Sequence, residues 1–407
     1  MKNIVERFIS YTRIDTTSAD DASTCPSTPN QFILARQLEE ELKELNLKDV
    51  HVDEHAFVYA TLPANSDRKC PVVGFLAHMD TSNMASGADI KARIIENYDG
   101  GDIELSEGIY TRVKEYPKIA ELKGHDIIVT DGTTLLGGDD KAGIAIIMDA
   151  IQNLVNDSDA RHGEIRVCFT PDEEIGAGIH NIRLEDFPCE YAYTVDGGDI
   201  DEVTYENFNA ATAVVNFIGN SIHPGDAKGK MINALQLAVD FHSMLPVFER
   251  PENTEGREGF NHIVSLQGEC EKAQAVYIIR NHDADELERQ KHEFTEIAEH
   301  MNRMYGREVV DCRVNNSYRN MKEAFADRMY IIDVVSETLR QMGIEPSYTP
   351  IRGGTDGAQL TYMGIPTPNL GTGGLFCHGN HEMVSINNMK KMSEIVFNLI
   401  LNIEKRG

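Results

Sequence analysis

The segment Pro71-Val-Val-Gly-Phe-Leu-Ala-His78-Met-Asp80 joins a short apolar run to a histidine and an aspartate. Such a run is typical of a strand buried in a parallel sheet, so we expect His78 and Asp80 where this strand ends. Open α/β sheets bind ligands in the crevice at the carboxyl ends of their strands. The segment therefore predicts a buried parallel sheet with a functional site at its edge.

Two later segments have the same design. Arg166-Val-Cys-Phe-Thr-Pro171 is typical of a strand that a proline stops, and Glu173 and Glu174 follow it. Tyr191-Ala-Tyr-Thr-Val is a third apolar run, and it ends at Asp196. We expect these acidic residues at the same edge of the sheet as the first segment.

Further candidate ligands lie outside these strands. Asp139 and Asp140 follow a Gly-Gly turn and open an apolar helix, where acidic groups are favourable, and His378 lies in a later turn. Imidazole and carboxylate groups without thiolate suit zinc, cobalt or manganese. The alternative is a set of solvated turn residues in a very acidic protein. The placement of five such groups at strand ends and turns favours a two-metal hydrolytic site.

Two carboxylates have positions that suit supporting roles. Asp80 lies two residues from His78 on the same face of an extended segment, so it can accept the second ring N–H of that histidine. Glu173 is adjacent to Glu174, and neighbours in an extended turn face different ways. One can therefore bind metal while the other stays free as a general base.

Composition limits the class of protein. The 407 residues, 41% of them apolar, are enough for two domains with buried cores. A formal charge of -28 argues against nucleic acid or an anionic membrane as a partner. The seven cysteines are scattered and odd in number, as expected of reduced thiols in the cytoplasm. The first residues do not form a signal peptide, and no apolar run reaches membrane-spanning length.

The pattern of elements changes near Phe208 and changes back near Tyr318. Before the first point, helices such as 32–45 alternate with short strands, as in a doubly wound α/β sheet. Between the points we predict a strand at 212–218, a helix at 232–244, strands near 263–267 and 275–280, a helix at 284–304 and a strand at 308–314. This β-α-β-β-α-β order predicts a ferredoxin-like domain at 208–317, inserted as a lid into a catalytic domain of residues 1–207 and 318–407. After residue 324 we expect a helix, a short strand, a strand at 367–370 and a helix from 388.

Eight segments, spread over essentially the whole chain, resemble the peptidase T family of tripeptide aminopeptidases. They are His-Met-Asp-Thr (78–81), Leu-Leu-Gly-Gly-Asp-Asp-Lys-Ala-Gly (135–143), Phe-Thr-Pro-Asp-Glu-Glu (169–174), Tyr-Thr-Val-Asp-Gly-Gly (193–198), Asn-Phe-Asn-Ala-Ala (207–211), Ile-His-Pro-Gly (222–225), Arg-Gly-Gly-Thr-Asp-Gly-Ala-Gln-Leu (352–360) and His-Gly-Asn-His-Glu (378–382). The wider group contains dizinc exopeptidases and amidohydrolases such as carnosinases and aminoacylases. The resemblance implies an α/β catalytic domain with a mixed sheet and an inserted lid and dimerisation domain.

The resemblance also implies a ligand set for two zinc ions. His78, Asp139 and Asp196 would hold one ion, and Asp139, Glu174 and His378 would hold the other, so that Asp139 bridges them. The family pattern selects Asp139 over Asp140, and His378 over His381. Neither choice follows from the residues alone.

The implied reaction is hydrolysis of a peptide bond by hydroxide generated at the two metals. Asp80 would orient His78, and Glu173 would be the general base that takes the proton from water and returns it to the leaving amine. The substrates would be short peptides, chiefly tripeptides, cut after their first residue. The alternatives are a dipeptidase, carboxypeptidase or aminoacylase of the same group, or a peptide or metal carrier without activity.

Substrate contacts are expected from the second half of the chain. The guanidinium of Arg352, on a Gly-rich turn, can grip a carboxylate with two hydrogen bonds, although a structural arginine bonded to backbone carbonyls is the alternative. By resemblance His223 would reach the reacting carbonyl group, and Asn233 and Arg280 are weaker candidates. Cys377, next to His378, departs from the family pattern. Edge strands of the lid, together with the resemblance, predict a homodimer.

Overall fold

The computed structural model describes residues 2–407, which form two compact units. The first unit consists of the chain up to Tyr205 together with 324–349 and 355–407. The second consists of 206–323 and 350–354. The expected insert, 208–317, lies within the second unit, which also contains 318–323 and the short segment around Arg352.

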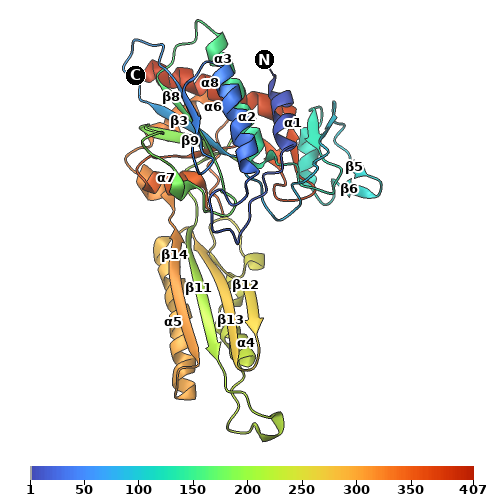
Figure 1. Cartoon of the computed structure of the whole chain (residues 1–407), viewed down its shortest axis with the longest axis vertical. Helices are drawn as coiled ribbons and strands as arrows, with labels where there is room; N and C mark the ends of the chain where they lie inside the picture. Colours follow the sequence, from blue (N-terminus) through green and yellow to red (C-terminus); the bar gives the residue numbers. More distant parts are fainter. Residues whose placement is uncertain (1) are drawn as a thin grey trace. The chain divides into compact units, whose positions relative to one another are not determined.

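A seven-stranded mixed sheet forms the centre of the first unit (Figure 1). In spatial order its strands are β1 (Lys48–Val52), β2 (Val58–Leu62), β8 (Ile165–Thr170), β3 (Val73–His78), β9 (Tyr191–Val195), β15 (Asn369–Leu370) and β10 (Val203–Thr204). Strands β8, β3, β9 and β15 are parallel neighbours, and the outer pairs are antiparallel. The α/β fold with a mixed sheet is therefore confirmed, as are the three apolar strands predicted from the sequence.

Helices cover the sheet and explain why its central strands are apolar. Strand β3 is buried along its whole length, and α3 (Gly138–Asn156) packs against β3 and β9 as well as α1 (Ile4–Thr12) and α8 (Ile386–Arg406). The short helix α7 (Asp356–Tyr362), which was not predicted, packs against β9. The remaining helices are α2 (Gln31–Glu44) and α6 (Tyr330–Gln341), which correspond to predicted helices. Among residues 2–407 no helix has the length and apolar character to cross a membrane.

A second, small sheet of the first unit was missed by sequence reasoning. Its strands are β16 (Gly374–Leu375), β17 (Met383–Ser385), β7 (Ile127–Val129) and β4 (Arg93–Ile95), and a separate hairpin joins β5 (Ile103–Ser106) to β6 (Ile109–Thr111). These strands are two to four residues long, too short to give a readable alternation of apolar and polar residues. The connection between β16 and β17 carries His378.

The second unit has the predicted β-α-β-β-α-β order. It consists of β11 (Asn209–Ile218), α4 (Ala234–Met244), β12 (Phe260–Gly268), β13 (Lys272–Asn281), α5 (Ala284–Tyr305) and β14 (Val310–Tyr318). The antiparallel sheet has the order β12-β13-β11-β14, as in ferredoxin-like domains. Helices α4 and α5 pack on this sheet, and Asp283 caps the start of α5 through the N–H groups of Asp285 and Glu286.

Candidate metal centre

The strand ends meet as expected. His78 is the last residue of β3 and pairs with Thr170, the last residue of the parallel neighbour β8. Asp196 directly follows β9 on the other side of β3. Because parallel strands place their carboxyl ends at one edge, the residues that follow them lie side by side.

His78 is buried at the centre of this group. Its Nε2 is 2.8 Å from Oδ1 of Asp139 and 3.8 Å from Oδ1 of Asp196. On the other side of the ring, Nδ1 is 3.0 Å from the backbone oxygen of Asp80 and 3.4 Å from its carboxylate. The shorter contact is therefore to the backbone, whereas the sequence had suggested the carboxylate. Burial by itself lowers the pKa of His78, but the hydrogen bonds to Asp139 and Asp80 outweigh it and raise that pKa.

The carboxylate of Asp80 holds the turn that follows β8. Its Oδ1 accepts a hydrogen bond from the backbone N–H of Glu173 at 3.0 Å, and its Oδ2 accepts one from Glu174 at 3.2 Å. Asp80 is completely buried. One side chain thus connects the end of β3 to the two glutamates that the sequence singled out after β8.

The Asp139-Asp140 pair follows Gly137, whose φ of 73° few residues other than glycine adopt. The peptide bond between the two aspartates is cis, and both have non-helical backbone angles. Both residues lie in the first turn of α3, as expected. Regular helix begins after Asp140, which acts as its cap by accepting the N–H of Gly143 at 3.1 Å.

The carboxylates of Asp139 and Asp140 have different partners. Each oxygen of Asp139 faces one histidine, with 2.8 Å from Oδ1 to Nε2 of His78 and 3.3 Å from Oδ2 to Nε2 of His378. The oxygens of Asp140 accept backbone N–H groups instead, from Gly143 and His78. Asp139 therefore presents its carboxylate to side chains of the site, and Asp140 supports the backbone around it.

His378 reaches the site from the small sheet. Its Nε2 is 3.0 Å from Oε2 of Glu174, and its backbone has a φ of 65°, an uncommon value for histidine. The hydrogen bonds to Asp139 and Glu174 raise the pKa of His378 to about 10. His381, the other candidate in this turn, instead contacts Thr111 Oγ1 at 2.9 Å.

Glu382 is a site residue that sequence reasoning missed. It is buried, and its carboxylate accepts the backbone N–H groups of Leu136, Gly137 and Asp139 at 2.6, 2.8 and 3.0 Å. Burial raises the pKa of Glu382 to about 7. The His378-x-x-x-Glu382 spacing was visible in the sequence, but its partners lie far away along the chain and no local signal shows them.

The carboxylates of this site outnumber the cationic groups around them. Burial, with the neighbouring Asp139, raises the pKa of Asp196 well above its usual value. Burial likewise raises the pKa of Glu173, although His78 opposes it, and Asp196 and Glu174 add to the rise. Asp139 differs, because hydrogen bonds from His378 and His78 outweigh the effect of burial and lower its pKa.

Two overlapping groups of side chains could hold a metal ion. His78, Asp139 and Glu174 form one group, and His78, Asp140 and Asp196 form the other, with ligand atoms within 4.8 Å of one another in each. In addition, Oε1 of Glu174 is buried without a hydrogen-bond partner among the described residues. An acceptor in this state is costly unless a cation or a donor satisfies it.

The four residues predicted to bind substrate all belong to the second unit, where each makes local contacts. Arg352 donates from Nη1 to the carbonyl oxygens of Gly256 and Glu258, and its guanidinium lies over the ring of Phe208. Arg280 donates to two backbone carbonyls, Asn233 caps α4, and the exposed His223 accepts the N–H of Gly225. The contacts of Arg352 match the alternative of a structural arginine bonded to carbonyls.

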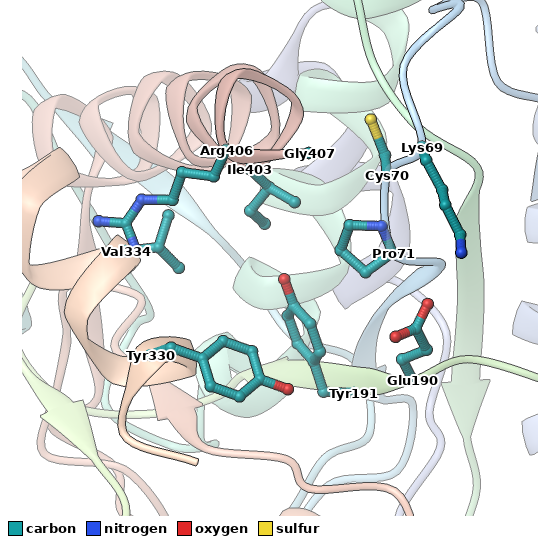
Figure 2. A pocket seen from close by; sticks show the side chains of 10 residues that line it. All are labelled: Lys69, Cys70, Pro71, Glu190, Tyr191, Tyr330, Val334, Ile403, Arg406 and Gly407. Atoms are coloured by element: carbon teal, nitrogen blue, oxygen red, sulfur yellow. The ribbon is translucent and has the colours of Figure 1, made fainter.

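A pocket of about 410 Å³ lies elsewhere in the first unit (Figure 2). Its lining includes Pro71, which precedes β3, and Tyr191, which begins β9, together with Tyr330 and Arg406. It therefore lies toward the amino ends of the parallel strands, whereas the candidate metal centre lies at their carboxyl ends. None of the candidate ligands lines it.

Comparisons with known proteins agree with this geometry. Residues 131–402 match the model of peptidase family M20/M25/M40. Peptidase T of Geobacillus sp. (strain WCH70) is 48% identical, with 100% of both chains covered, and peptidase T of Clostridium perfringens (strain 13 / Type A) is 48% identical over 98% of each. The crystal structure of aminopeptidase PepT from Bacillus cereus ATCC 10987 has the same fold, with a TM-score of 0.78 at 24% identity over 98% of each chain. The chain therefore belongs to the peptidase T family, within peptidase family M20/M25/M40.

Proposed function

We propose that this peptidase is a metal-dependent aminopeptidase that releases the N-terminal residue from short peptides, chiefly tripeptides. The observation that carries the proposal is the meeting of His78, Asp139, Glu174, Asp196 and His378 at one sheet edge, with Glu173 beside them. The choice of substrate is supported by the peptidase T relatives, which are 48% identical over essentially the whole chain.

The donor set suits a pair of divalent cations. We infer that His78, Asp139 and Asp196 would hold one cation, and that Asp139, Glu174 and His378 would hold the other. Asp139 is preferred over Asp140 as the shared ligand because its two oxygens face two different histidines, while those of Asp140 are occupied by backbone N–H groups. Imidazole and carboxylate ligands favour zinc, with cobalt or manganese as substitutes.

When bound, the cations would polarise the peptide carbonyl and lower the pKa of the attacking water. Glu173 would take the proton of that water and return it to the nitrogen of the leaving amine. Its position supports this role, because Asp80 fixes its backbone N–H, while the ion pairs to Nε2 of His78 and of His378 are made by Asp139, Asp196 and Glu174 instead. Burial raises the pKa of Glu173, which favours a carboxyl group that must hold a proton briefly.

Asp80 would position two parts of this machinery together. Its backbone oxygen fixes the ring of His78 through Nδ1, which leaves Nε2 for a metal, and its carboxylate fixes Glu173 and Glu174. For the residues of the second unit, we propose that His223, Asn233, Arg280 and Arg352 contact the substrate. Arg352 would grip its C-terminal carboxylate with a guanidinium that exchanges its bonds to Gly256, Glu258 and Thr254 for bonds to the substrate.

We also propose a homodimer that forms through the second unit. Strand β12 is the edge of its sheet, and Val264 and Leu266 on that strand are 49% and 43% exposed. Exposed apolar side chains on an edge strand favour pairing with another chain. Light scattering that gives the mass of a monomer at micromolar concentration would contradict this part of the proposal.

A panel of peptides tests the function directly. Free, N-acetylated and C-amidated di-, tri- and tetrapeptides are incubated with metal-loaded protein, and the products are identified by mass spectrometry. We expect free tripeptides to lose their first residue, and N-acetylation to abolish cleavage. Release of the C-terminal residue would indicate a carboxypeptidase, cleavage of dipeptides alone a dipeptidase, and cleavage of the acetyl group an aminoacylase. No hydrolysis at all would indicate a carrier.

A further inference from the structure

Asp172, the residue immediately before Glu173, has an unusual conformation. It follows Pro171, which comes directly after β8, and it is completely buried with a φ of 55°. A non-glycine residue in the left-handed region persists where surrounding contacts hold it. The structure supplies those contacts from a segment near the start of the chain.

The carboxylate of Asp172 is held by Ser27, which precedes α2, and by Gln31, the first residue of α2. The backbone N–H and the hydroxyl of Ser27 donate to it at 2.7 and 2.5 Å, and Nε2 of Gln31 donates at 2.6 Å. In return, Oε1 of Gln31 accepts the backbone N–H of Asp172 at 3.2 Å. Gln31 therefore contacts Asp172 twice, once as donor and once as acceptor, and it is completely buried itself.

The turn that carries Glu173 is thus held from two sides. From the end of β3, Asp80 accepts the N–H groups of Glu173 and Glu174. From the start of α2, Ser27 and Gln31 fix Asp172. The carbonyl of Asp172 also accepts N–H groups from Ala177 and Gly178, at 3.1 and 3.2 Å.

We propose that Ser27, Gln31 and Asp172 form a positioning clamp that sets the orientation of Glu173 for proton transfer. The inference rests on the proposed function, in which Glu173 is the general base. None of the three residues belongs to the metal-binding groups, so they would act through the backbone of the turn. A displacement of about 1 Å at a reacting group can lower the rate roughly 100-fold, so loss of the clamp should lower kcat measurably.

An exchange of hydrogen-bonding partners tests the clamp. Gln31→Glu places two carboxylates against each other, and Asp172→Asn places two amide N–H groups against each other. In the double variant, the amide introduced at position 172 can donate one N–H to the new carboxylate at position 31 and the other to the hydroxyl of Ser27, which turns to accept it, while its oxygen still accepts the backbone N–H of Ser27. Each single variant should therefore lower kcat, and the double variant should regain most of the lost kcat.

The readouts are kcat, KM, metal content and melting temperature. We expect each single variant to lower kcat by ~10-fold or more with KM and metal content nearly unchanged, since the clamp acts on a proton-transfer group. Recovery of most of that kcat in the double variant supports the clamp. The matched control is Gln37→Glu on the same helix, because Nε2 of Gln37 donates to Ser10 and Glu41, away from the turn. That variant should lose stability without losing kcat.

A second background separates positioning from general damage. If Gln31 acts through Glu173, Gln31→Glu should cause little further loss of kcat in the Glu173→Gln protein. An equal loss in both backgrounds, or single variants with normal kcat and a lowered melting temperature, would overturn the inference. Wild-type protein without peptidase activity would instead contradict the proposed function, so the two failures can be told apart.

Discussion

Two sets of carboxylates in the first unit differ in the cationic groups that they contact. In the Glu41 cluster, the buried side chain of Glu41 contacts Arg7 at 3.1 Å, Lys2 at 2.9 Å and the hydroxyl of Tyr11 at 2.8 Å. In the candidate metal centre, carboxylates cluster around His78 and His378 without an arginine among their ion pairs in the described part of the chain. The buried Lys141 near that site donates to the backbone oxygen of Ile14.

The pKa shifts follow this difference. Burial by itself raises the pKa of Glu41, but hydrogen bonds from Lys2, Gln37 and Tyr11 lower it below its usual value. In the metal centre, burial raises the pKa of Asp196 and of Glu173. The first cluster has cationic partners within the protein, whereas in the second the carboxylates outnumber the cationic groups, which suits the binding of a cation.

Removal of metal should have the largest effect on activity, and it should act on the candidate metal centre and not on the Glu41 cluster. After dialysis against a chelator, we expect peptidase activity to fall to the background rate and the melting temperature to decrease, because the carboxylates of the metal centre repel one another. Added zinc should restore both. Metal analysis by mass spectrometry should then give two ions per chain. Full activity in metal-free protein would contradict the proposal that the carboxylates of the candidate metal centre bind catalytic cations.

Glu173→Gln should separate proton transfer from metal binding within the second cluster. We expect kcat to fall by at least ~100-fold, because an amide cannot accept the proton of water. The metal content should stay at the wild-type value, since the proposed ligand carboxylates are those of Asp139, Asp196 and Glu174, which face the two histidines. Near-normal turnover would show that another residue is the base, and loss of metal would show that Glu173 is a ligand.

Glu41→Gln should affect stability and leave catalysis unchanged. At pH 7 we expect a loss of roughly 2–4 kcal/mol of unfolding free energy, because the buried Arg7 loses its charged partner. The pKa of Glu41 is lower in the folded state, so its stabilisation is present above about pH 4.5, the usual value for glutamate, and is lost as the pH falls through the folded value. Denaturant melts at several pH values should show the difference between variant and wild type shrinking in acid. A difference that does not depend on pH would contradict this assignment.

Cys377→Ser should have the smallest effect. The thiol lies next to His378, but neither metal-binding group includes a cysteine among the described residues. We expect metal content and kcat within about twofold of wild type, since imidazole and carboxylate ligands complete the site without sulfur. A fall in metal content would show that the thiol is a ligand and that the second cluster is built differently.

The parts of the fold that could be predicted are those with a local signal. Strands β3, β8 and β9 are continuous apolar runs, and the residues after them are the ones that meet. The order of elements in the second unit was also predicted correctly, because α5 has a strong helical pattern between an aspartate cap and Gly306. Periodicity and end signals are properties of a few neighbouring residues.

The parts that escaped prediction depend on distant partners. Strands of two or three residues, such as β16 and β17, are defined by what they pair with. Glu382 and Gln31 look like ordinary polar residues until the fold places a backbone turn against each of them. The partners of Arg352, the carbonyl oxygens of Gly256 and Glu258, likewise lie far from it along the chain, where no local signal shows them.

The double attachment of Asp80 has a consequence for engineering this enzyme. The backbone oxygen of Asp80 contacts the ring of His78, and its carboxylate accepts the N–H groups of Glu173 and Glu174. The two segments therefore depend on each other for their conformation. A chimaera that imports residues 78–80 from a relative while keeping the native 171–174 would inherit a mismatch. Experiments that aim to change the substrate preference should therefore take both segments from the same protein and vary only the loops around them.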